Sequence, residues 1–98
     1  MHDDPMWCPV APDAVAWREW EGEVVLYNHA TGDTHHLDPF GGSVMLSLLR
    51  HPGGIRMRAL LQEISAGFET EPIAQLAGDI ERVLADLARL HLAVRTTA

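Results

Sequence analysis

The sequence predicts an α+β domain of winged helix-turn-helix type, in which a three-stranded antiparallel β-meander is followed by three α-helices. Three observations predict this class. Short alternating apolar runs separated by tight, glycine-containing turns occupy residues 15–37. An Asp-Pro pair typical of a helix start follows the last run directly. Apolar residues then recur at helical spacing in three segments separated by breaks that contain Gly or Pro.

The meander is predicted from its turns. The expected strands are Val15–Trp20, Glu23–His29 and Thr34–Leu37. Glu21-Gly22 joins the first two, and residues 30–33 join the second to the third; connections this short link antiparallel neighbours. The second strand carries apolar residues on both faces, so we expect both faces to be covered. The third strand is last in order and has one neighbour within the meander, which leaves backbone groups unpaired along its other edge.

The first helix is expected to begin at Asp38, a good N-cap residue, with Pro39 in the first helical position. It is expected to end at the segment 51–54, His-Pro-Gly-Gly. One face of this helix is apolar and comprises Phe40, Val44, Met45, Leu48 and Leu49. The pair Gly41-Gly42 either weakens the first turn or allows another backbone to approach closely.

Two further helices follow. The second is expected from about Arg56 to Ala66, with Gly67 at its C-terminal end. The third begins near Pro72 and has the strongest helical pattern in the chain. Its apolar stripe consists of Ile73, Leu76, Ala77, Ile80, Val83, Leu84, Leu87 and Leu90. Residues 92–94 are expected to form a short strand or a packed tail.

The length of 98 residues predicts one folded domain rather than two. Residues 1–12 hold three of the six prolines and little periodicity, so we expect an irregular N-terminal arm there and the winged-helix domain over 13–98. The sequence leaves open whether this arm, through Trp7 and Val10, covers the free edge of the meander.

The charge balance disfavours binding to nucleic acid. The chain has 14 acidic residues against 7 basic ones, a formal net charge of −7, and no lysine. Affinity for nucleic acid depends largely on Lys and Arg side chains that neutralise phosphates. A winged-helix DNA-binding regulator is therefore an alternative that the topology permits and the charge opposes.

We expect the protein to be cytoplasmic. Its single cysteine, Cys8, rules out an internal disulfide and fits a reducing compartment. The first ten residues are acidic and lack a long apolar run, so no secretory signal is expected there. No apolar run approaches the roughly 20 residues that a membrane-spanning helix needs.

The sequence does not predict an enzyme, a cofactor site or a metal site. A glycine-rich phosphate loop, a nucleophile elbow and paired carboxylates in an apolar setting are all missing. His35 and His36 are adjacent in a predicted strand, so their side chains point to opposite faces and do not readily share one metal ion.

The region from Trp17 to Leu37 reads W-x-x-W-x-G-E-x-V-x-Y-x-x-x-T-G-D-T-H-x-L. This pattern resembles the PqqD-like family and, more closely, the subgroup described as HPr-rel-A system PqqD family proteins. The likeness extends over residues 14–95, and the element Thr31–His35 is its most specific part.

The resemblance implies a small winged-helix peptide chaperone, also called a RiPP recognition element. Such domains hold the leader of a ribosomally made precursor peptide and present its core to a modifying enzyme, often a radical SAM protein. In the subgroup, the associated protein is related to HPr kinase and the peptide is not established, which sets it apart from the family's role in PQQ biosynthesis.

In the family, the leader adds as a strand to the third β-strand and lies against the third helix. Carried over by position, the expected peptide-binding residues are Thr34, His35, His36, Leu37, Ile80, Val83, Leu84 and Leu87. The leading hypothesis is therefore a non-catalytic peptide-binding adaptor, either a monomer or a homodimer. A structural subunit that dimerises through the same strand edge is a further alternative.

Overall fold

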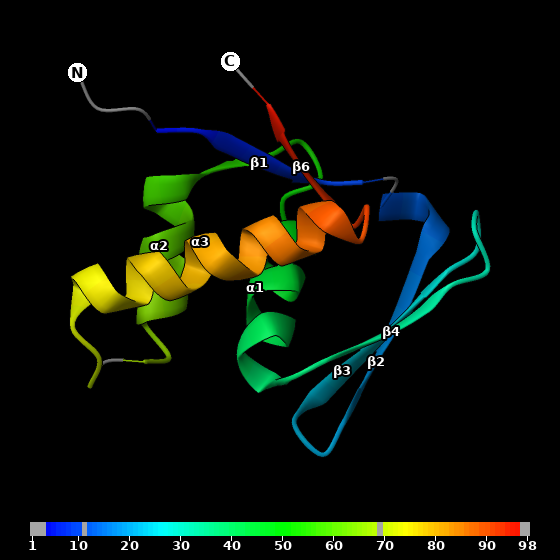
Figure 1. Ribbon diagram of the computed structural model, residues 1–98, viewed down its shortest axis with the longest axis horizontal. Coiled ribbons are helices and arrows are strands. Elements are labelled where there is room, and N and C mark those ends of the chain that lie inside the picture. The colour runs from blue at the N-terminus through cyan, green and yellow to red at the C-terminus, as the bar shows by residue number, and fades with distance from the viewer. Residues whose placement is uncertain (1–3, 11, 69, 97–98) are drawn as a thin grey trace.

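The computed structural model describes residues 4–10, 12–68 and 70–96. Three α-helices pack together, with one small sheet above them and a second beside them in Figure 1, and the predicted α+β winged-helix class is confirmed. The strands are β1 (Met6–Pro9), β2 (Val15–Trp20), β3 (Glu23–Asn28), β4 (Thr34–Leu37), β5 (Ile55–Arg56) and β6 (Ala93–Thr96). The helices are α1 (Pro39–Leu49), α2 (Met57–Ser65) and α3 (Ile73–Arg89), and a short 3-10 helix, η1 (Pro12–Ala14), precedes β2.

The predicted meander is present, with the strand order β2-β3-β4 and antiparallel pairing throughout. The turn between β2 and β3 has two central residues, Glu21 and Gly22, with φ angles of 53° and 83°. Positive φ at both positions is the geometry of a two-residue hairpin whose twist matches that of the strands.

The described residues cover only one face of the meander. Val24 and Leu26 of β3 are buried against the helices, whereas Val25 is half-buried and Tyr27 is exposed on the opposite face. The expectation that both faces of this strand are covered is therefore wrong. Apolar residues on a strand show which positions favour burial, but whether another element reaches that face depends on the tertiary arrangement.

Helix α1 begins as the sequence predicts. The Oδ1 atom of Asp38 accepts a hydrogen bond from the Gly41 N–H group at 2.7 Å, and Pro39 occupies the first helical position. Gly42 lies against β3, where a Cβ atom added to it would be 2.4 Å from Cγ2 of Val24. The glycine therefore allows α1 to pack closely on the meander.

The core lies between the helices and the inner face of the meander. In α3, buried leucines and isoleucine recur at helical spacing and contact both other helices. The fully buried side chains that dominate the core are Leu26, Met45, Leu48, Leu60, Leu76, Ile80, Leu84, Leu87 and Leu92.

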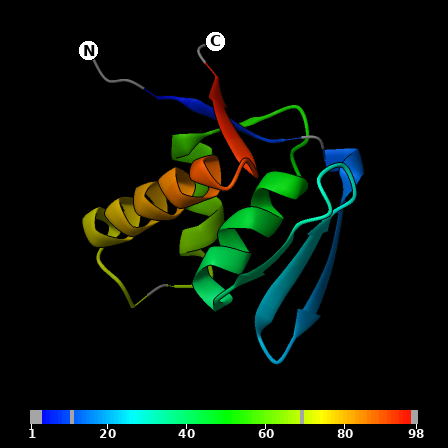
Figure 2. The same cartoon turned by 45° about the vertical axis from the view of Figure 1, so that its right-hand side comes forward.

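The second sheet has the order β5-β1-β6 and joins the two ends of the described chain (Figure 2). Trp7 in the central strand pairs with Arg95 of β6 on one side and with Ile55 of β5 on the other. The prediction of an irregular arm is thus wrong for Met6–Pro9. This strand depends on partners far away in the sequence, so its short, proline-flanked segment shows no local signal.

The position of β1 also answers the question that the sequence left open. Within the described residues, the N-terminal segment pairs with β5 and β6, and it does not pair with the meander. The tail expected at residues 92–94 forms part of β6. None of the helices in the described part of the chain has the length and apolar character required to cross a bilayer.

Candidate functional site

The free edge of β4 is the first component of the candidate site. Within the described residues, β4 pairs only with β3. The Asn28 N–H group donates to the Asp33 carbonyl at 2.9 Å, and the His29 N–H group donates to the Ala14 carbonyl at 2.7 Å. Successive residues of β3 therefore direct their backbone groups alternately toward β4 and toward β2.

This alternation identifies the unpaired backbone groups of β4. His35 lies opposite Leu26, and Leu37 lies opposite Val24. In an antiparallel ladder every second pair of opposite residues is hydrogen-bonded. Both of these pairs lie an even number of residues along β3 from the hydrogen-bonded pair Asn28–Asp33, so the backbone groups of His35 and Leu37 face β3. The N–H and C=O groups of Thr34 and His36 consequently point away from the sheet, where another strand could pair with them.

A groove beside this edge is the second component. It has a volume of about 510 Å³ and runs between the end of β4, the start of α1 and the C-terminal half of α3. Its apolar lining comes mainly from Leu37, Val83, Leu87 and Leu90, the last of which is 42% exposed. The remaining lining residues are His36, Asp38, Gly41, Asp86 and Arg89.

The structure brings together most of the residues predicted for the site. Thr34, His35, His36 and Leu37 form β4, and Val83 and Leu87 line the groove with His36 and Leu37. Ile80 and Leu84 are 0% exposed and belong to the core, so the prediction that they contact the peptide is wrong. The centre of a wide apolar stripe faces the core, and only its flank remains available to the groove.

The sequence prediction missed Asp38, Gly41, Asp86, Arg89 and Leu90 as groove residues. Leu90 continues the apolar stripe three residues after Leu87, a spacing that places the two on one side of the helix. The charged residues showed no such signal, because their position depends on how α3 lies against β4.

Two ion pairs lie along α3, and one of them, between Arg89 and Asp86, borders the groove. Arg89 pairs with Asp86, and Arg82 pairs with Asp79, each one turn apart on the helix. Among the described residues, Asp86 therefore pairs with Arg89 and not with Arg82.

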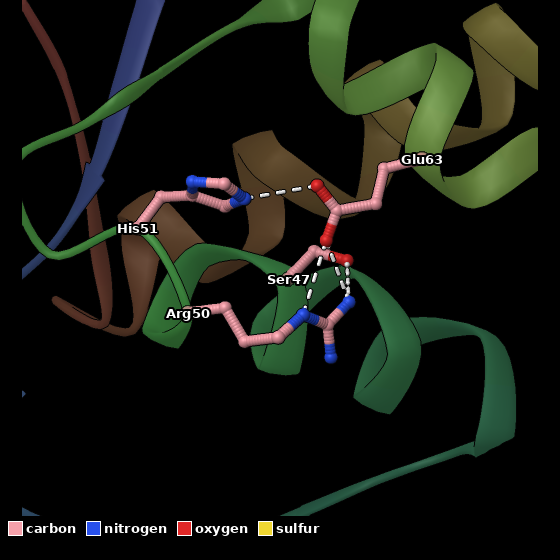
Figure 3. A network of polar contacts seen from close by, with 4 residues as sticks. All are labelled: Ser47, Arg50, His51 and Glu63. Carbon is pink, nitrogen blue, oxygen red and sulfur yellow. Dashed lines mark hydrogen bonds and ion pairs between the residues drawn. The ribbon is translucent and has the colours of Figure 1, made fainter.

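A separate polar network joins the C-terminal end of α1 to α2 (Figure 3). The guanidinium of Arg50 donates to Oε1 of Glu63 at 2.7 Å and to the buried Ser47 hydroxyl at 2.9 Å. The His51 ring lies 2.9 Å from Oε2 of Glu63. The hydrogen bond from Arg50 is the main cause that lowers the pKa of Glu63, and His51 also lowers it, while partial burial acts in the opposite direction.

None of the described residues forms a cluster of three or more His, Cys, Asp or Glu side chains that could hold a metal ion. His35 is opposite Leu26 on the inner side of the meander, and His36 is opposite Val25 on the outer side. The two imidazoles are therefore directed to different surfaces.

The fold is that of a winged-helix domain whose meander ends in an open strand edge beside an apolar groove. The model of the family described as "Coenzyme PQQ synthesis protein D (PqqD)" matches residues 23–93. The chain therefore belongs to the PqqD family. Comparison with curated protein sequences finds no significant match.

A solved structure described as "TbiB1 in Complex with the TbiA(beta) Leader Peptide" is similar to this chain, with a TM-score of 0.72 and 23% sequence identity. The similarity covers 92% of this chain and 99% of that one. It shows that the two proteins share a fold over nearly their whole lengths.

Proposed function

We propose that this protein is a non-catalytic adaptor that binds the leader of a ribosomally made precursor peptide by strand addition to β4. The observation that carries the proposal is the open edge of β4 beside an apolar groove of about 510 Å³. An extended peptide at such an edge gains affinity from backbone hydrogen bonds and selectivity from alternate side chains.

Each part of the site has a distinct role in this proposal. The outward N–H and C=O groups of Thr34 and His36 pair with the peptide backbone. Side chains of the peptide that point inward enter the groove and contact Leu37, Val83 and Leu90. Because successive side chains alternate between faces, we expect apolar residues at every second position of the bound segment.

Membership of the PqqD family and the shared fold with a protein solved in complex with a leader peptide support this occupant. We further propose that the adaptor acts in the cytoplasm and presents the peptide to a modifying enzyme, such as a radical SAM or HPr-kinase-related protein.

Proline at position 36 tests the proposal, because it removes one outward N–H group and no bond to β3. Edge strands accept proline where the N–H would face solvent. We expect His36→Pro to lower peptide affinity about tenfold or more, since a buried carbonyl of the peptide would lose its donor. His36→Ala, which keeps the N–H, is the matched control and separates the backbone from the imidazole.

The measurement is a titration of ¹⁵N-labelled protein with the precursor peptides encoded beside this gene. Circular dichroism and the unfolding midpoint verify that the variants fold. Equal affinity for peptide in the two variants and the unaltered protein would show that the peptide does not pair with β4. Position 35 is unsuitable for this test, because proline there would remove a bond within the meander.

A further inference from the structure

The outer face of the meander is the largest cluster of exposed aromatic residues in the described chain and has no role in peptide binding as proposed above. Trp20 is 66% exposed and Tyr27 is 41% exposed. Together with Ala16, Arg18 and Val25 they form a shallow depression of about 420 Å³, with Trp17 at its border. We call Ala16, Arg18, Trp20, Val25 and Tyr27 the outer face.

The strand register shows that these residues form one continuous surface. Ala16 lies opposite Tyr27, and Arg18 lies opposite Val25, so all four side chains project from the same side of the sheet. The ring of His29 packs edge-on against Tyr27 with 4.8 Å between the ring centroids, which restrains the tyrosine. This contact limits the positions that the Tyr27 ring can adopt on the surface.

Charges at this surface are unpaired. Arg18 in the depression forms no ion pair among the described residues. Glu21 and Glu23 at the β2–β3 turn and Asp33 at the opposite end of the meander are exposed, and their carboxylates also form none there. An apolar centre is thus bordered at both ends by carboxylates that can form ion pairs with basic residues of a partner.

The outer face adjoins the edge where the peptide is proposed to bind. Thr34 lies opposite Tyr27 and His36 lies opposite Val25, so both β4 side chains belong to this side of the sheet. A strand added to β4 would extend the same surface, with every second peptide side chain on it. A protein docked on the outer face could contact the held peptide directly.

We propose that the outer face is the docking surface for the enzyme that modifies the held peptide, through an apolar patch on that enzyme bordered by Lys or Arg. The inference rests on the proposed adaptor function. Trp, Tyr and Arg are the residue types that contribute most to protein interfaces. A second copy of this chain fits less well, because each copy carries a net charge of −7 and the same carboxylate border.

The experiment measures binding of the purified modifying enzyme encoded beside this gene to the full chain, with and without the precursor peptide, by calorimetry. We expect Trp20→Ser to weaken enzyme binding at least about tenfold, because truncation of a large aromatic residue at an interface has effects of this size. Ile73→Ser is the matched control: Ile73 is 56% exposed but lies at the start of α3.

Charge reversal supplies an independent readout. The double substitution Glu21→Lys and Glu23→Lys should slow association with the enzyme and reduce its dependence on salt concentration, since attraction between opposite charges accelerates encounter. A salt dependence that is the same in both proteins would contradict the proposed basic border on the enzyme.

Peptide titration of the same variants distinguishes the two proposals. Unaltered peptide affinity with weakened enzyme binding in Trp20→Ser supports the outer face as a separate surface. Equal enzyme binding by Trp20→Ser and the unaltered protein, or no enzyme binding at about 100 µM, would overturn this inference alone.

A concentration-dependent dimer abolished by Trp20→Ser would assign the surface to a second copy and would also overturn it. Failure of every peptide to bind would instead reject the adaptor function.

Discussion

At the scale of single residues, Gly42 determines how closely α1 packs on the meander. The sequence left two explanations for the pair Gly41-Gly42, a weak first turn or a close approach. The structure favours the second for Gly42, because the space that a Cβ atom would need is occupied by the side chain of Val24. The Asp38 cap, in contrast, was predictable, since Asp-Pro at a helix start is a local signal.

We expect Gly42→Ala to lower the free energy of unfolding by about 1–3 kcal/mol, the usual range for an extra carbon in a packed core. A Cβ atom there would lie 2.4 Å from Cγ2 of Val24, so the helix or the strand must move. Urea unfolding followed by circular dichroism measures the change.

Gly78→Ala is the matched control, because Gly78 also lies in a helix and a Cβ atom there would meet nothing within 4 Å. Alanine at that position should stabilise the protein by up to about 1 kcal/mol. A similar effect of both substitutions would show that contact with Val24 does not govern the response at position 42.

At the scale of elements, the ion pairs between α1 and α2 make stability depend on pH. Glu63 accepts from Arg50 and contacts His51, and these partners lower its pKa in the folded state. A carboxylate whose pKa is lower when folded contributes stability above its ordinary pKa. That contribution is lost as the pH falls through the lower value of the folded state.

A double-mutant cycle with Arg50→Ala and Glu63→Gln isolates this interaction. We expect a coupling energy of about 0.5–1 kcal/mol at pH 7, because the guanidinium is largely exposed, and a value near zero once Glu63 is protonated. Denaturant unfolding of the four proteins at several pH values provides the measurement. Coupling that persists unchanged at acidic pH would show that the ion pair is not its source.

The elements also show how far the sequence could predict the site. The strands β2, β3 and β4 were predictable because their turns and alternation are local. The sheet β5-β1-β6 was not, because its pairs join residues such as Trp7 and Arg95 that are far apart in the chain. The apolar stripe of α3 predicted a helix correctly. It did not indicate that Val83 and Leu90 line the groove while Ile80 and Leu84 fill the core.

At the scale of the whole molecule, the two sheets have different roles. The sheet β5-β1-β6 joins segments from both ends of the described chain (Figure 1). The candidate groove lies beside the meander. The edge of β4 and the outer face belong to one meander but face different directions. In the proposed function, peptide and enzyme therefore occupy the protein together without competing for the same atoms.

The exchange of backbone amide hydrogens in β4, with and without the precursor peptide, tests strand addition most directly. We expect the amides of Thr34 and His36 to exchange quickly in the free protein and to slow at least about tenfold when peptide binds, because they acquire acceptors. The amides of His35 and Leu37 already face β3 and should change much less. Saturating peptide that leaves Thr34 and His36 unprotected, or that protects β2 instead, would contradict the account.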